Sequence, residues 1–188
     1  MRKLLLISAV LAFSASAAFA VPTVGIYFDP GMANSDGTVE PLVENGTIYV
    51  ILSDMNAAVA GVEYDLTLPA EVVVLGHNYV GGNGFVINGS PTSYAIGFAN
   101  CELIGLGGGP ATFIVDEITF LTLSEFSSSP VSLEACTACG DDIGVTSPRY
   151  AGCSNTVYNL TASNGTLSSQ IVPVQSESWG AVKALFAN

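Results

Sequence analysis

The segment Gly61–Leu68 constrains the fold of this chain more than any other, because its apolar and polar residues alternate strictly. The apolar positions are Val62, Tyr64, Leu66 and Leu68, and the polar positions between them are Glu63, Asp65 and Thr67. A period of two with one polar side is typical of a half-buried strand in an antiparallel sheet. The segment therefore predicts a strand that packs one face against a core and exposes the other.

The rest of the chain contains further, shorter segments whose composition is typical of strands. Runs rich in Val, Ile, Thr, Tyr and Phe are separated by Gly, Asn, Ser and Pro, which is the composition of strands and turns. Further strands are expected at residues 24–28, 47–52, 71–75, 85–87, 94–98, 111–123, 131–133 and 156–160. The turn residues 88–91 predict a hairpin, and the change of apolar phase around Asp116 predicts a β-bulge. Many short strands with frequent turns predict an all-β fold, an antiparallel β-sandwich.

Both ends of the chain differ from this pattern. Residues 1–20 begin with Arg2 and Lys3, continue as a short apolar run and end at the small-residue site 18–20, as a secretory signal peptide does. We expect the β-sandwich at residues 21–166 and a C-terminal tail at 167–188. Trp179, Val182 and Phe186 have helical spacing, which predicts a short helix in that tail. No segment after residue 20 has enough unbroken apolar residues for a membrane span.

The charge of the chain excludes several kinds of partner. After residue 20 only Arg149 and Lys183 are basic, against sixteen acidic residues, so the net charge is near −14. Nucleic acid and anionic membranes are unsuitable partners because no cationic patch can form. The acidic residues are scattered, which favours a role in solubility, with divalent-cation binding as the alternative.

Four cysteines, Cys101, Cys136, Cys139 and Cys153, all lie after residue 20. An even number in an exported chain indicates two disulfides. Of the three pairings we expect Cys101–Cys136 and Cys139–Cys153. A zinc site is the alternative, since Cys136 and Cys139 have ligand-like spacing, and a redox-active pair is the third interpretation. Residues 140–154 are expected to form a loop pinned by these bonds.

Candidate catalytic residues are few. His77 is the only histidine, and Ser90 or Ser93 would have to serve as its nucleophile; we interpret His77 as an ordinary residue at the edge of a loop. Glu63, Asp65, Glu71 and Glu102 could in principle supply the carboxylate pair of a glycosidase. Because Glu63 and Asp65 lie on the polar face of one strand, a solvated strand face is the favoured interpretation.

Calcium is the ion that the acidic residues could bind. Asp29, Asn34 and Asp36, or Asp141 and Asp142, carry oxygen ligands of the kind that Ca²⁺ prefers. Turn chemistry accounts for residues 29–31 and 34–37 without a metal. No cofactor is therefore expected, with Ca²⁺ as the alternative.

Three blocks of the sequence resemble the cohesin-like β-sandwich domains of secreted bacterial proteins. They are residues 46–50, residues 59–76, and residues 111–123 followed by 130–133. The resemblance covers residues 24–135 and implies a nine-stranded, immunoglobulin- or jelly-roll-like sandwich with a role in binding proteins or surfaces. Typical cohesins lack this group of cysteines, and no dockerin-type calcium repeat or catalytic module accompanies the domain.

The function expected from these features is that of a secreted, non-catalytic binding or structural module. Adhesion or assembly at the cell surface or in a matrix, through contacts with a protein, is the leading hypothesis. A carbohydrate-binding module with a polysaccharide partner, with or without Ca²⁺, is the alternative, and a secreted hydrolase is the third. Rows of exposed aromatic side chains would favour sugar, a convergent polar pocket would favour an enzyme, and one apolar patch would favour a protein partner.

Overall fold

The computed structural model describes residues 21–79, 84–89, 92–107, 109–139 and 145–171. Thirteen strands are found in these residues: β1 (Thr23–Tyr27), β2 (Asp36–Val39), β3 (Asn45–Ser53), β4 (Ala57–Thr67), β5 (Val72–Tyr79), β6 (Gly84–Gly89), β7 (Ser93–Ile104), β8 (Phe113–Thr122), β9 (Phe126–Glu134), β10 (Arg149–Gly152), β11 (Val157–Asn159), β12 (Thr161–Ser163) and β13 (Gly165–Ser169). Within the same residues, no helix is long and apolar enough to cross a membrane. The all-β prediction is confirmed, whereas the expected signal peptide and tail helix lie outside the described residues.

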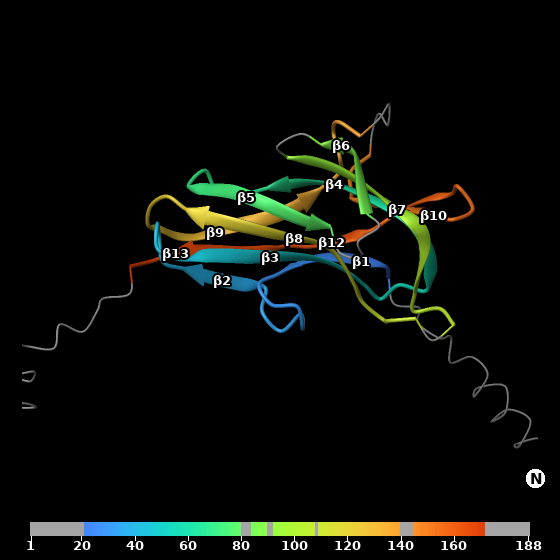
Figure 1. Cartoon of the computed structure of the whole chain (residues 1–188), viewed down its shortest axis with the longest axis horizontal. Coiled ribbons are helices and arrows are strands. Elements are labelled where there is room, and N and C mark those ends of the chain that lie inside the picture. The colour runs from blue at the N-terminus through green and yellow to red at the C-terminus, as the bar shows by residue number, and fades with distance from the viewer. Residues whose placement is uncertain (1–20, 80–83, 90–91, 108, 140–144, 172–188) are drawn as a thin grey trace, which may run out of the picture.

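The strands form two sheets whose long strands run along the length of the molecule (Figure 1). The five-stranded sheet has the order β12-β1-β3-β8-β5, so β5 is an edge strand. The eight-stranded sheet has the order β11-β10-β4-β9-β13-β2, with β7 beside β4 and β6 beside β7. The predicted hairpin between residues 85–87 and 94–98 is confirmed as the antiparallel pair β6–β7.

Strand β4 is the centre of the eight-stranded sheet. β7 pairs with one side of it, and β10 and β9 follow one another along its other side. Val62, Tyr64 and Leu66 of β4 are buried, as its alternating pattern predicts, and belong to the core that both sheets share. Burial of each such side chain stabilises the fold by about 1.5–3 kcal/mol.

The first strands of the sandwich pair with its last strands. β1 pairs in parallel with β12 in one sheet, and β2 pairs in parallel with β13 in the other. The sequence did not reveal β2, β12 or β13, because these strands are short and polar. β13 continues past residue 166, where the tail was expected to begin, and its Leu167 is fully buried.

The predicted β-bulge in residues 111–123 is confirmed. The register between β3 and β8 shifts between Val50 and Ile51, which leaves Val115 of β8 as the extra residue. Val115 and Asp116 are therefore consecutive buried residues, and Asp116 faces the core in phase with Ile118 and Phe120. The bulge thus brings a carboxylate into an otherwise apolar interior.

Candidate functional site

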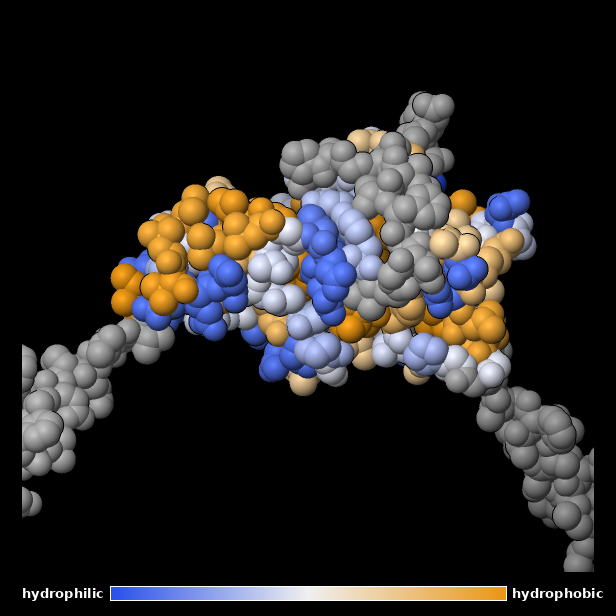
Figure 2. Space-filling view, viewed as in Figure 1, coloured by the Kyte–Doolittle hydropathy of each residue, from blue (hydrophilic) through white to orange (hydrophobic). Residues whose placement is uncertain are grey.

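An apolar patch covers one end of the five-stranded sheet. Its members are exposed by 40% to 72% and are Leu42, Val43, Val73, Leu75 and Leu123. Figure 2 shows the corresponding apolar surface at the left end, over the start of β5 and the neighbouring turns. Hydrogen bonds bring these segments together, because the N–H of Leu42 donates to Thr122 and that of Leu123 donates to Glu71.

The patch lies beside a strand edge that no described strand covers. Among the described strands β5 pairs only with β8, so no described strand pairs with its other edge. Exposed edges and contiguous apolar patches are both typical of sites that contact other proteins. Sequence reasoning missed the patch because its residues come from three separate segments.

A second feature is a cluster of polar side chains between the two sheets. Nδ1 of His77 lies 2.8 Å from Oδ2 of the fully buried Asp116, and the Tyr64 hydroxyl donates to the same oxygen over 3.3 Å. The Tyr94 hydroxyl lies 3.3 Å from Nε2 of His77. The interpretation of His77 as a loop-edge residue is wrong, because His77 is on β5 and pairs with Ile118.

Burial, together with the charge of Asp116, keeps the surrounding phenols protonated. Burial and the charge of Asp116 raise the pKa of Tyr79 to about 12. The same two causes raise the pKa of Tyr94, and raise that of the fully buried Tyr64 well above its ordinary value. Three tyrosine hydroxyls are therefore available as hydrogen-bond donors throughout the physiological range.

The arrangement differs from a serine hydrolase relay. His77 and Asp116 have the separation of such a pair, but the hydroxyl at Nε2 belongs to Tyr94. Ser93 is buried on β7, and Ser90 lies outside the described residues. The geometry supports a hydrogen-bonded cluster that fixes the orientation of the imidazole rather than an activated serine.

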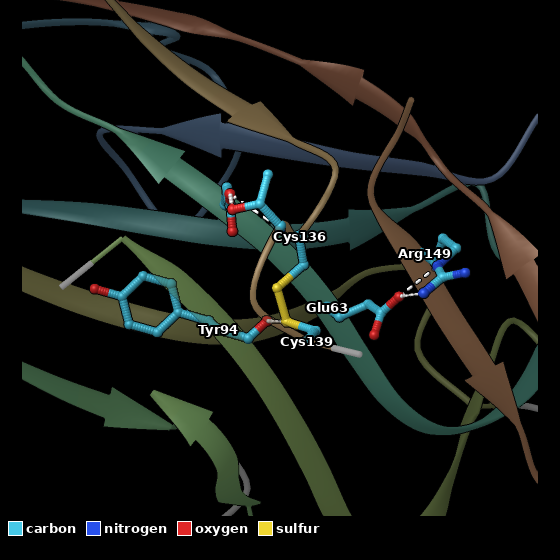
Figure 3. Close-up of a disulfide and its surroundings, with 7 residues drawn as sticks. Glu63, Tyr94, Cys136, Cys139 and Arg149 are labelled. Atoms are coloured by element: carbon cyan, nitrogen blue, oxygen red, sulfur yellow. Dashed lines mark hydrogen bonds and ion pairs between the residues drawn. A yellow bond between two sulfur atoms is a disulfide. The ribbon is translucent and has the colours of Figure 1, made fainter. Parts of the chain in front are cut away.

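The polar face of β4 is occupied by fixed contacts. Glu63 forms an ion pair with Arg149 of β10, and Figure 3 shows this pair close to the disulfide of residues 136 and 139. The Asp65 carboxylate accepts hydrogen bonds from the backbone N–H and the hydroxyl of Thr137, over 3.1 and 2.7 Å. The expected common face of Glu63 and Asp65 is confirmed, and each carboxylate has its own partner on it.

The other acidic candidates are spread over the molecule. Glu71 precedes β5, and Glu102 lies near the end of β7, opposite Val59. Asp29 accepts hydrogen bonds from the backbone N–H groups of Gly31, Ala33 and Asn34. Although desolvation opposes them, these hydrogen bonds lower the pKa of Asp29. Asp36 accepts a hydrogen bond from Thr166.

These contacts leave little for a metal to bind. In the part of the chain that the structure describes, no group of three or more His, Cys, Asp or Glu side chains could hold an ion. Asp141 and Asp142 lie outside that part. The turn chemistry expected for residues 29–31 is present, because the Asp29 side chain closes its own loop.

The four cysteines form the disulfides Cys101–Cys153 and Cys136–Cys139. The expected pairing of Cys101 with Cys136 and of Cys139 with Cys153 is wrong. β7 and β10 lie on opposite sides of β4, and a bulge in β7 places residues 98–101 opposite Ala60. Cys153 follows β10 directly and donates its N–H to Ala58, so both partners meet at the same point of β4. The loop expected over residues 140–154 is wrong for part of its length, because Arg149–Gly152 form β10.

Neither a family model nor a curated protein matches the sequence. Solved structures do match its fold. A cohesin module of a family 33 glycoside hydrolase from Clostridium perfringens has a TM-score of 0.58 at 11% identity, over 80% of this chain and 97% of that one. A non-cellulosomal cohesin from the archaeon Archaeoglobus fulgidus has a TM-score of 0.54 at 12% identity, over 90% of this chain and 100% of the other.

A third match is the sixth cohesin of scaffoldin B from Acetivibrio cellulolyticus, solved in complex with a dockerin. It has a TM-score of 0.53 at 12% identity and covers 80% of this chain and 100% of that cohesin. The chain therefore has a cohesin-like β-sandwich fold, as its sequence blocks predicted. At such identities the likeness concerns the fold alone.

Proposed function

We propose that this protein is a secreted, non-catalytic module that binds another protein through the apolar patch at the edge strand β5. The patch is the observation that carries the proposal. Its five side chains expose 40% or more of their surface, although the protein is otherwise strongly acidic. Apolar side chains gathered at one end of a soluble domain are typical of a contact surface for a macromolecule.

The charge around the patch defines the chemistry of the partner. Glu44 follows Val43 directly, and the backbone oxygen of Glu71 accepts a hydrogen bond from the N–H of Leu123. The side chain of Glu125 accepts a hydrogen bond from the N–H of Ile171 beside the turn that carries Leu123. The whole chain after residue 20 has a net charge near −14. A suitable partner therefore presents apolar side chains surrounded by Lys and Arg, because opposite charges at the rim accelerate association and exclude other partners.

The fold supports a binding role in general terms. One of the similar solved structures is a cohesin in complex with a dockerin, so this type of sandwich can serve as a protein-binding module. The predicted signal peptide supports a contact outside the cytoplasm, where adhesion or assembly at the cell surface or in a matrix is the role that we favour. Among the side chains that the structure describes, which exclude those of residues 84–89, Tyr158 is the only aromatic one exposed to a comparable degree, so these side chains form no exposed aromatic row of the kind that favours a polysaccharide.

The test is capture of partners from the culture supernatant by immobilised protein, with and without EDTA. The bait is compared with the double variant Val43→Ser, Leu75→Ser and with the matched control Leu103→Ser, Val157→Ser, whose side chains are similarly exposed elsewhere. We expect one protein to bind the wild type and the control, and to lose at least about tenfold in affinity for the patch variant. Its binding should weaken with salt, since Glu44 and Glu125 at the rim are solvent-exposed.

Equal capture by the patch variant would refute the assigned surface. Recovery of polysaccharide alone, or of nothing, would refute the protein-binding function. Loss of capture in EDTA would add a divalent ion to the contact, since the remaining interactions do not depend on one.

A further inference from the structure

A cleft opens between the two sheets on the inner side of β5. It has a volume of about 690 Å³, within the usual range for pockets that hold small organic molecules. One end is aliphatic and includes Leu68, Val72 and Val74, and the other end includes His77, Tyr79 and Tyr94. The patch of the proposed function lies on the outer side of the same strand, so the cleft is a separate site.

The described lining of the cleft carries no carboxylate and no lysine or arginine. This is notable in a chain with sixteen acidic residues. Asp116 is fully buried behind His77, and its Oδ2 is occupied by His77 and Tyr64, so the described lining offers a cation no exposed counter-charge. An anion would be repelled by the net negative charge of the protein. The lining is therefore complementary to a neutral molecule.

The polar end of the cleft has a flat wall and a defined hydrogen-bonding pattern. The rings of His77 and Tyr79 are stacked, with centroids 5.6 Å apart and planes inclined by 11°. Nδ1 of His77 lies 2.8 Å from Oδ2 of Asp116 and its Nε2 lies 3.3 Å from the Tyr94 hydroxyl, so hydrogen-bond partners on both sides fix the ring. Burial and the charge of Asp116 keep the phenols of Tyr79 and Tyr94 protonated, and a phenolic hydroxyl can both donate and accept hydrogen bonds.

The shape and chemistry of the two ends together define a ligand class. A flat ring would pack against the wall of His77 and Tyr79, since aromatic rings prefer stacked or edge contacts. A hydroxyl group on that ring could donate and accept at once. An alkyl chain opposite the hydroxyl would reach the aliphatic end at Val72 and Val74. We propose that the cleft binds a neutral, hydroxyl-bearing ring compound with an apolar substituent, of the alkylphenol type.

The test is an NMR titration of the whole ¹⁵N-labelled protein with 4-propylphenol. We expect saturable shifts in β5, β7 and the end of β4, with a dissociation constant on the order of 1 mM for a ligand of this size. The methyl ether 4-propylanisole, which cannot donate, should bind at least about fivefold more weakly. The anion 4-propylbenzoate should cause no saturable shift.

Two variants control for the location. Ala70 lines the mouth of the cleft and is exposed, so Ala70→Trp blocks the entrance without entering the core. Ala33→Trp adds the same side chain at an exposed position in the loop after β1. Ala70→Trp should weaken binding of 4-propylphenol at least about tenfold, and Ala33→Trp should leave it unchanged.

Three results would overturn the proposal. They are a wild-type titration that does not saturate, equal binding by Ala70→Trp and wild type, and equal affinity for the phenol and its ether. None of these would affect the proposed protein contact, which is measured by capture and by variants of the outer face of β5.

Discussion

The two disulfides close loops of very different size, so their removal should cost different amounts of stability. Cys101 and Cys153 are separated by 52 positions, whereas Cys136 and Cys139 are separated by 3. A crosslink stabilises mainly by restricting the unfolded chain, and the effect grows with the logarithm of the loop length. The variant Cys101→Ser, Cys153→Ser should therefore lose about 4 kcal/mol, and Cys136→Ser, Cys139→Ser about 2 kcal/mol.

Urea unfolding followed by circular dichroism measures this difference. With a slope of about 2 kcal/mol per molar urea, the midpoint should fall by about 2 M for the first variant and about 1 M for the second. Equal midpoints, or a larger loss for the short loop, would refute the argument from loop size.

Digestion without reduction tests the pairing itself. Cleavage after Glu and Asp separates Cys101 and Cys153 into different peptides and leaves Cys136 and Cys139 together in residues 135–141. We expect one adduct of two peptides, and an unlinked 135–141 peptide that is two hydrogens lighter. Either of the other two pairings would join all three peptides in one adduct, which would refute the observed connectivity.

Three further predictions concern the core and the turns. Asp116→Ala leaves Tyr64 and His77 without their acceptor and should lower the free energy of unfolding in urea by about 3–5 kcal/mol. The outward-facing control Glu117→Gln should change it by less than about 0.5 kcal/mol. Similar losses of stability in the two variants would contradict the hydrogen-bonded cluster. Gly107→Ala should cost about 1–2 kcal/mol of stability, because Gly107 has a positive φ. Gly105→Ala should cost clearly more, because Gly105 also has a positive φ and its Cβ would lie 2.0 Å from the backbone oxygen of Met55. Equal losses of stability would contradict this packing. In an ultraviolet titration Tyr79 should ionise near pH 12, and Tyr79→Phe should remove this step. Because the pKa of Tyr79 is higher in the folded than in the unfolded state, its contribution to the stability of the fold is complete below about pH 10 and is lost between about pH 10 and 12.

The strands that could be predicted are those whose apolar residues follow a simple period in the sequence. β4 is the best example, because every second residue from Val62 to Leu66 enters the core. β10 and β13 could not be predicted in this way. They are short and polar, and they are strands only because β4, β9 and β2 offer them backbone partners.

The position of His77 was missed for a specific physical reason. Val72 and Val74 point inward, so strict alternation would direct His77 outward. The register between β5 and β8 shifts at Leu75, which is an extra residue on β5, and the phase of the strand is reversed beyond it. By contrast, Asp116 lies in phase with Ile118 and Phe120, so the sequence did contain the signal for a buried carboxylate that needs a partner.

The same bulge explains how one edge strand can serve two surfaces. Before it, β5 contributes Val73 to the outer patch and Val74 to the inner cleft, as alternation requires. Beyond it, the reversed phase directs His77 and Tyr79 inward, so the cleft changes from aliphatic to polar along a single strand. Outer-face variants therefore remove apolar contacts without altering the cleft, and Ala70→Trp blocks the cleft without altering the patch. Because the two sets of residues are disjoint, the protein contact and the small-molecule site can each fail experimentally while the other stands.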